Sequence, residues 1–274
     1  MSICIKVDPV NPGQFFACCG LLELADRFWH GAEGWFERPE FCIECVGTVD
    51  ALLAQLVMDP PKELTKLENG LDAKKIIAPL RFSFNGGASH TFTIDAWIAM
   101  GMYKGKPTVL PNRPWNFWSG NQKSFDIWMD LRSALVKQLP ELTGEKAKSL
   151  FGYRVPLTGR FGFDPGAAWN ALDVGFSPNT QKMPVASSPA TEMLAAIGIQ
   201  RFRPVLSHDR KSFIYSTWGR PLAPPVAAAA SSGLVSVEPA DQFRGRVVDR
   251  GQYAALGYST ILKGAYDGER TYAV

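Results

Sequence analysis

The segment NPGQFFACCGLLELADRFW, residues 11–29, decides how the first half of the chain is expected to fold. The Asn11 side chain can accept a hydrogen bond from a helix N–H group, and Pro12 supplies the backbone angle of a first helical position. A helix is therefore predicted from here to about Trp29. Four small residues, 17–20, stand among its large apolar residues. We interpret them as a stripe that lets the helix lie close against a β-sheet.

The cysteines give this segment a second interpretation. Cys18 and Cys19 could join Cys42 and Cys45 in a zinc site, because zinc takes four thiolate or imidazole ligands. Adjacent helical residues point about 100° apart, however, so this pair would not face one metal. We therefore expect no metal, no cofactor and buried thiols. All five cysteines, Cys4 included, are predicted to be reduced, because the chain shows no sign of secretion and the cytosol opposes disulfides.

The sequence around this helix predicts an α+β fold. SICIKVDP, residues 2–9, alternates apolar and polar residues as a half-buried strand does, and two short strands are expected around a turn at residues 38–39. A helix capped by Thr48 and two further β-type segments, 74–84 and 90–97, follow. The order βαββαβ predicts a ferredoxin-like fold, with antiparallel sheets and helices on one face. The opposite face of such sheets often binds single-stranded RNA.

Three regions are expected: a ferredoxin-like half (1–110), an aromatic loop and connecting helix (111–144), and a C-terminal α+β half (145–274). The last contains a second proline-capped helix within residues 187–202, a strand pair near 203–218, and a small-residue segment at 221–233 that is predicted to be a flexible loop or linker. Aligning Gly20 with Gly198 pairs QFFACCGL with EMLAAIGI, which suggests two related halves.

Charge is distributed unevenly along the chain, whose net charge is +3. The first 60 residues carry three Lys and Arg against nine Asp and Glu, a balance of −6, which leaves +9 for the remainder. An acidic first segment suits a protein neighbour or a solvated face, and a basic remainder suits a polyanion. No apolar run reaches the ~20 residues of a membrane span and no secretory signal is visible, so a cytoplasmic protein is expected.

Catalytic motifs are absent from the sequence: there is no nucleophile elbow, P-loop or paired histidine metal motif. His90 follows a glycine pair and precedes a predicted strand, where a general base for attack by an RNA 2′-hydroxyl could be held. A lone loop histidine is more often solvated or hydrogen bonded. We therefore expect a non-catalytic protein and keep His90 as an alternative.

Basic residues interleaved with aromatic ones predict RNA binding more directly. Cations neutralise phosphates and rings stack on bases. The alternative is that tryptophans anchor the core and arginines cap sheet edges. The RNA-binding candidates are Lys104, Lys106, Arg113, Trp115, Lys123, Arg201, Arg203, Arg210, Lys211, Arg244, Arg246 and Arg250.

Four phrases, at residues 8–29, 117–126, 160–181 and 186–204, together resemble a RAMP-like effector subunit of subtype I-U (I-G) CRISPR-Cas systems. The resemblance spans nearly the whole chain and rests on these phrases, with no catalytic signature. It implies a role in antiviral defence, assembled with CRISPR RNA and other Cas subunits into a complex that recognises target DNA by guide pairing. It also implies ferredoxin-like folds, often duplicated. A metal-independent endoribonuclease that processes the CRISPR transcript and a protein-protein adaptor remain alternatives.

Overall fold

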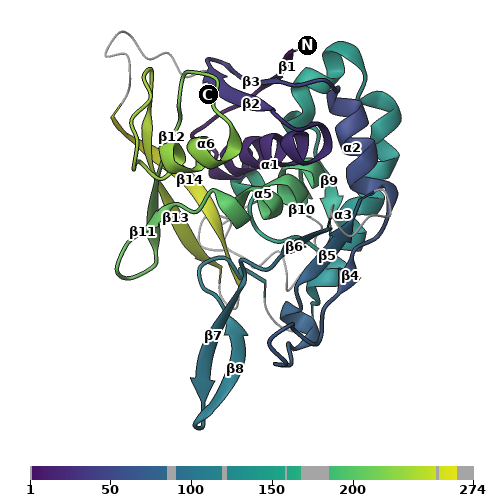
Figure 1. Cartoon of the computed structure of the whole chain (residues 1–274), viewed down its shortest axis with the longest axis vertical. Helices are drawn as coiled ribbons and strands as arrows, with labels where there is room; N and C mark the ends of the chain where they lie inside the picture. The colour runs from purple at the N-terminus through teal and green to yellow at the C-terminus, as the bar shows by residue number, and fades with distance from the viewer. Residues whose placement is uncertain are drawn as a thin grey trace.

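The computed structural model describes residues 2–84, 91–118, 122–157, 159–167, 185–250 and 253–263. It confirms a mixed α+β fold with several small antiparallel sheets. Two helices, α1 (Pro12–Trp29) and α5 (Pro189–Arg201), lie side by side in the middle of the molecule, with strands and other helices around them (Figure 1). His90 and residues 168–184 fall outside the described residues.

Helix α1 and its neighbouring strands form as predicted. The Asn11 side chain accepts a hydrogen bond from Gln14 N at 3.1 Å and so caps the helix. The strands β1 (Ser2–Lys6), β2 (Glu33–Glu37) and β3 (Glu40–Glu44) form the N-terminal sheet in the order β1-β3-β2, both pairs antiparallel. Strands β1 and β2 are therefore parallel to each other, with α1 as their connection. Helix α2 (Val49–Met58) follows, capped by Thr48.

The following strands do not add to the N-terminal sheet. Strand β5 (Leu80–Ser83) pairs with β4 (Lys62–Glu63) and β6 (Thr91–Ile94) in a sheet of their own. Strands β7 (Ile98–Tyr103) and β8 (Lys106–Pro111) form a separate hairpin that projects from the body (Figure 1). The first three strands thus have the order of a split βαβ unit. The complete ferredoxin-like assignment stays a prediction.

The connecting helix expected within residues 111–144 is α3 (Ser124–Gln138). Short 3₁₀ segments follow it, and β9 (Val155–Leu157) pairs with β10 (Val185–Ser187). After α5, the strand pair β11 (Val205–Leu206) and β12 (Ser212–Ser216) forms as predicted. With β13 (Gln242–Arg250) and β14 (Tyr253–Lys263) these strands build the C-terminal sheet, in the order β11-β12-β13-β14.

The prediction of a flexible loop or linker at residues 221–233 is wrong, because this segment contains helix α6 (Pro224–Ser231). Its two prolines occupy the first turn, where a missing N–H costs nothing, and four alanines follow, the residues with the highest helix propensity. Ala227 and Ala230 are buried against the rest of the molecule. The small-residue composition therefore marks a packed helix here.

The small residues of α1 meet a different partner from the one expected. The helices α1 and α5 run parallel, since both N-terminal caps contact Asp164 and the C-terminal ends meet where Arg201 donates to Glu23. A Cβ at Gly20 would overlap the Leu194 carbonyl, and one at Gly198 would overlap the Phe16 carbonyl. The stripe therefore serves helix-to-helix contact, and the aligned glycines face each other. The relatedness of the two halves stays a prediction.

One cluster of buried hydrophobic residues extends from Ile3 to Leu256 and includes α1, α3 and α5. The buried core is therefore continuous across residues 110 and 144, and the division into three regions stays a prediction. Among the described residues, no helix is long and apolar enough to cross a membrane.

The cysteines are partly as expected. Cys18 and Cys19 are fully buried in α1, and burial raises the pKa of both thiols well above its usual value, so neither is a reactive thiolate. The prediction that all five are reduced is wrong for Cys4 and Cys42, which form a disulfide with a Cα–Cα distance of 4.2 Å. The reason is the register of β1 and β3, which places these residues directly opposite each other.

Candidate nucleic-acid interface

An open cleft of about 400 Å³ lies at the C-terminal ends of α1 and α5, beside strand β6. We call it the arginine cleft. It brings together three guanidinium groups, two carboxylates and several smaller polar groups. The residues that line it are Glu23, Arg27, Thr91, Phe92, Thr93, Asp95, Gln200, Arg201 and Arg203.

Glu23 organises the cleft. Its side chain is only 3% exposed, and its two oxygens accept hydrogen bonds from two arginines. Arg27, one helical turn further along α1, donates through Nε to Oε1 at 2.7 Å. Arg201, on α5, donates through Nε to Oε2 at 2.5 Å and through Nη2 to Oε1 at 3.2 Å. One buried carboxylate therefore fixes two guanidinium groups at the mouth of the cleft.

The guanidinium groups keep donors for a further partner. Each offers five N–H groups in a planar fork, and Glu23 takes only some of those of Arg27 and Arg201. Arg27 also lies 4.5 Å from the centroid of the Phe92 ring, which holds its plane in place. Because arginine forks match the oxygens of phosphate, the arrangement suits a phosphate group.

Asp95 sets the charge balance of the cleft. Burial raises the pKa of this carboxyl, and the charge of Arg203 opposes the rise. Arg203 itself is exposed and donates through Nε to the Gln200 carbonyl at 3.2 Å. Three arginines against Glu23 and Asp95 leave the lining with a formal charge of +1. The lining therefore carries a small net positive charge, which Asp95 lowers, and the nearby charge of Asp26 also acts on Arg201.

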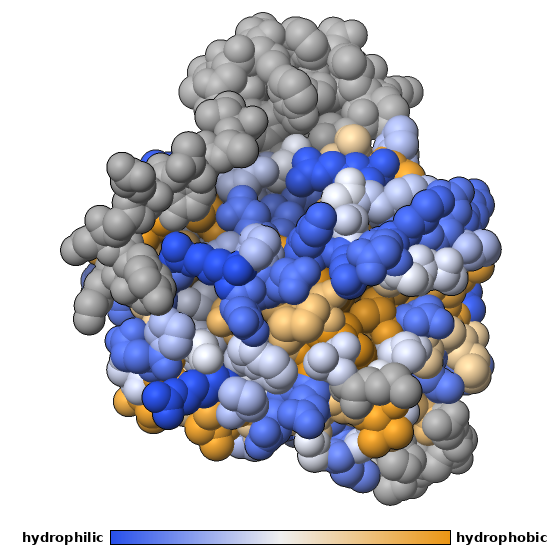
Figure 2. Space-filling model, turned by 90° about the horizontal axis from the view of Figure 1, so that it is seen from above, coloured by the Kyte–Doolittle hydropathy of each residue, from blue (hydrophilic) through white to orange (hydrophobic). Residues whose placement is uncertain are grey.

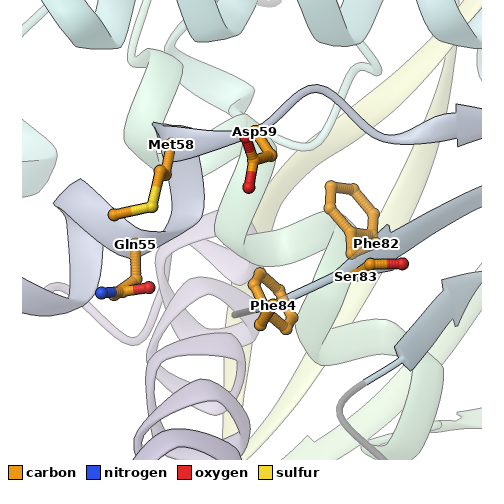
Figure 3. Close-up of a pocket in the computed structure, with 6 residues that line it drawn as sticks. All are labelled: Gln55, Met58, Asp59, Phe82, Ser83 and Phe84. Carbon is orange, nitrogen blue, oxygen red and sulfur yellow. The ribbon is translucent and has the colours of Figure 1, made fainter. Parts of the chain in front are cut away.

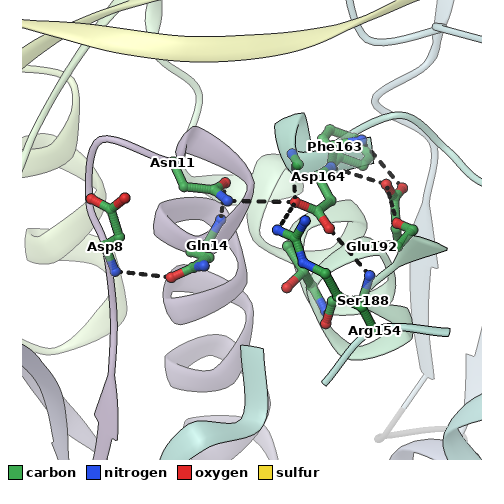
Figure 4. A network of polar contacts seen from close by, with 11 residues as sticks. Asp8, Asn11, Gln14, Arg154, Phe163, Asp164, Ser188 and Glu192 are labelled. Atoms are coloured by element: carbon green, nitrogen blue, oxygen red, sulfur yellow. Dashed lines mark hydrogen bonds and ion pairs between the residues drawn. The ribbon is translucent and has the colours of Figure 1, made fainter. Parts of the chain in front are cut away.

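The opposite end of the α1–α5 pair holds a closed polar network (Figure 4). Glu192 accepts from the backbone N–H groups of Gly162, Phe163 and Asp164 at 2.8, 3.2 and 2.9 Å. Asp164 accepts from Asn11, Arg154, Gly166 and the backbone of Ser188. Burial raises the pKa of Glu192, although these backbone donors oppose the rise. Both carboxylates are at most 1% exposed. The network therefore ties the loop at residues 162–164 to the N-terminal caps of α1 and α5.

A second basic surface lies on the C-terminal sheet. Arg244 and Arg246 are exposed on β13, opposite Thr260 and Gly257 of β14 respectively, and Tyr258 beside them is 47% exposed. The other side of the sheet buries aromatic residues such as Phe213. We call the outward side the β13 face. Cations and exposed rings of these types are found in surfaces that bind single-stranded nucleic acid.

The structure scatters most of the remaining predicted residues. Lys104 and Lys106 flank Gly105 at the tip of the projecting hairpin. Arg210 donates to the Arg113 carbonyl at 3.0 Å, so these two lie together, and Lys123 pairs with Asp126 at 3.6 Å. Lys211 is exposed, and its carbonyl accepts from the β13 backbone at Val247, close to the β13 face. Among the predicted residues whose side chains the structure describes, Arg201 and Arg203 line the arginine cleft.

Trp115 is the one predicted contact that the structure corrects. It is 4% exposed, and its ring meets those of Phe16, Phe117 and Phe213 in the core. Its ring is therefore buried in the core, which favours the alternative that tryptophans anchor the core.

Two further predicted residues are not among those that the structure describes. The side chain of Arg250, at the end of β13, lies outside the described residues, as does His90. In the chain, His90 directly precedes Thr91, which lines the arginine cleft.

Sequence reasoning missed Arg27 and Gln200. The signal for Arg27 was present, because Glu23 and Arg27 are four residues apart on the predicted helix and this spacing brings a carboxylate and a guanidinium together. Their joint contact with Arg201, 178 residues along the chain, was not visible without the fold.

A second cavity lies between α2 and β5 (Figure 3). Its volume is about 10 Å³, which is room for about one water molecule. It is too small to hold a ligand. Gln55, Met58, Asp59, Phe82, Ser83 and Phe84 line it.

Comparisons of the chain with protein-family models, with curated proteins and with solved structures find no match.

Proposed function

We propose that this chain is a non-catalytic RNA-binding subunit of a CRISPR-Cas effector ribonucleoprotein, acting in the cytoplasm in antiviral defence. The sequence resemblance suggests the system, and the arginine cleft is the observation that supports RNA binding. CRISPR RNA and other Cas subunits would be its partners, and target DNA would be reached through the complex.

The cleft favours backbone recognition over base recognition. Its cationic donors come from Arg27, Arg201 and Arg203, which match phosphate oxygens, and Glu23 holds two of them in place. The β13 face adds Arg244 and Arg246 with an exposed tyrosine ring. Phosphate contacts of this kind position a strand without reading its sequence. We therefore expect salt-dependent binding with little preference among RNA sequences.

A salt series tests RNA binding directly. An oligouridine is titrated with the full chain at several salt concentrations, and fluorescence anisotropy gives the dissociation constant. For single strands the slope of log affinity against log salt falls by about 0.7 for each lost phosphate contact. R201A/R203A should therefore lower the slope by about 1.4. The charge-matched variant R220A/K137A, at two exposed positions away from both surfaces, should leave it unchanged.

An unchanged slope in R201A/R203A would exclude the arginine cleft. The same measurement on R244A/R246A separates the contribution of the β13 face. If neither double variant differs from the parent protein, RNA binding by these surfaces is wrong.

The assignment to an effector complex needs a separate test. The chain is co-expressed with the products of its neighbouring genes and a repeat array, then purified, and the retained RNA is sequenced. CRISPR RNA in the purified particle is the expected result. Particle assembly without RNA contact, shown by crosslinking, would favour the adaptor that the acidic first 60 residues suggest.

The endoribonuclease alternative is kept because His90 adjoins a cleft-lining residue in the chain. Cleavage by acid-base catalysis would persist in chelator and leave a 2′,3′-cyclic phosphate. H90A should abolish such cleavage. Cleavage at the parental rate in H90A would remove His90 as the base.

A further inference from the structure

The outer side of the N-terminal sheet carries a group of side chains that RNA binding does not use. Alternation along β1 and β3 turns Ile3, Ile5, Phe41 and Ile43 into the core. It leaves Cys4, Glu40 and Cys42 together on the other side. Figure 2 looks down on the end of the molecule where this sheet lies in Figure 1, and shows a mostly hydrophilic surface with a smaller hydrophobic area.

Three potential metal ligands meet at this point. The two sulfur atoms and a Glu40 carboxylate oxygen all lie within 4.8 Å of one another. Cys4 and Glu40 are half-buried and Cys42 is buried, so the group is reached from one side. In the part of the chain that the structure describes, this is the only group of at least three Cys, His, Asp or Glu ligands so placed.

The backbone geometry accommodates a metal once the sulfur atoms separate. Directly opposed residues in a pair of antiparallel strands have Cβ atoms about 4.5–5.5 Å apart. Thiolates on such a pair can each reach a zinc-sized cation at the usual Zn–S distance of about 2.3 Å after small χ1 rotations. Glu40 lies two residues before Cys42 on the same side of β3 and supplies a third ligand. A water molecule would complete a tetrahedral set.

The disulfide and a bound metal exclude each other, because the metal needs two thiolates. Reduction by a dithiol transfers two electrons and two protons: the Cys4–Cys42 bond breaks, two thiols form, and the dithiol becomes a disulfide. Binding of the cation then releases the two thiol protons. A reducing cytosol keeps such pairs open.

We propose that Cys4, Cys42 and Glu40 form a redox-gated site for a thiophilic divalent cation of the zinc class. The oxidised pair closes the site by the disulfide, and the reduced pair opens it. The disulfide and a bound cation each cross-link β1 to β3, whereas the reduced pair without a cation does not. This inference is independent of RNA binding and is an alternative to the expectation that the chain holds no metal.

Cobalt(II) is the probe for this site, because thiolate ligands give it a charge-transfer absorption. The full chain is reduced with a dithiol, freed of reductant by anaerobic gel filtration, and titrated. The reduced protein should bind one equivalent with a sulfur-to-cobalt band that zinc abolishes, and the oxidised protein should show no band. C4S and C42S should each weaken the band and the affinity.

E40Q keeps the test informative if the cysteine variants fail to fold. It retains both thiols and should weaken cobalt affinity about tenfold or more. The matched controls are E33Q, at an exposed carboxylate on β2, and C45S, at a cysteine outside the ligand group; both should bind as the parent does. Absence of a band in the reduced parent protein, or an E40Q affinity equal to the parental one, would overturn the three-ligand site.

Discussion

Each end of the α1–α5 pair holds a buried carboxylate, but one end is closed to solvent and the other opens onto a cleft. At the N-terminal end, Glu192 and Asp164 receive backbone N–H groups and are closed off from solvent. At the C-terminal end, Glu23 is equally buried, but its partners are the guanidinium groups of Arg27 and Arg201, which open onto a cleft. One end joins the fold together, and the other turns guanidinium groups toward an open cleft.

The difference lies in the donors and not in the carboxylates. A backbone N–H has one hydrogen to give, so the donors around Glu192 are used up. A guanidinium has five, so Arg27 and Arg201 bind Glu23 and retain N–H groups that face the cleft. The contrast therefore holds between Glu192, whose three backbone donors are used up, and Glu23, whose two guanidinium partners have N–H groups left.

The largest effect should come from breaking the contact that holds both ends together. A methyl group in G198A would overlap the Phe16 carbonyl in the middle of α1. We expect the free energy of unfolding in urea to fall by about 3 kcal/mol or more, the upper range for overpacking. G152A, where a Cβ meets nothing within 4 Å, is the control and should change stability little. Equal stabilities would show that the helices do not meet at Gly198.

The closed end should affect stability alone. In E192Q an amide NH₂ replaces one oxygen and faces backbone N–H donors, which leaves at least one of them without an acceptor. Urea denaturation should show a loss of about 1–3 kcal/mol. Oligouridine affinity of the folded fraction should equal that of the parent protein. Weaker RNA binding in E192Q would contradict the separation of the two ends.

The open end should show the reverse. R201A removes donors to the cleft, while Arg27 still pairs with Glu23. We expect the unfolding free energy to change by less than about 1 kcal/mol, because Arg201 is a half-exposed partner. RNA affinity should fall about tenfold, the effect of about 1.4 kcal/mol from a charged hydrogen bond. R201K tests the fork, since lysine keeps the charge without the planar donors.

The smallest effect concerns pH. Burial raises the pKa of Asp95, so this carboxylate takes up its proton at a higher pH than usual. As pH falls toward that pKa, the negative charge that opposes RNA phosphates is lost, and oligouridine affinity should rise. We expect a gain of about 0.5 kcal/mol, typical of a partly screened pair. D95N should bind oligouridine at neutral pH as tightly as the parent does at acid pH, and its affinity should change less with pH. If the affinity of both proteins changed with pH in the same way, Asp95 would have no part in the electrostatics of the cleft.

Local features were predictable from the sequence. Asn11 with Pro12 fixed the start of α1 because capping and proline preference act within a few residues. The small residues around Gly20 indicated a close approach, but not to what, because a helix and a sheet ask for the same small side chains. The place of Trp115 was ambiguous for the same reason, since an aromatic residue near cations in the sequence can belong to the core or to a stacking surface.

The candidate site was only half predictable. Arg201 and Arg203 were named from their charge, whereas the contact of Arg201 with Glu23 depends on two helices packing in parallel across 178 residues. The disulfide was missed for a similar reason. A strand pattern shows which side a cysteine faces, and only the register of β1 and β3 shows that Cys4 lies opposite Cys42.

The glycine contact between α1 and α5 also sets a condition on how the chain is made. Its two sides are separated by about as many residues as Glu23 and Arg201, which are 178 apart. At a synthesis rate of about 5–20 residues per second, the first helix leaves the ribosome roughly 9–36 s before its partner. Throughout that interval the side of α1 that packs on α5 has no permanent cover, so the newborn chain passes through an aggregation-prone stage that the finished molecule no longer shows.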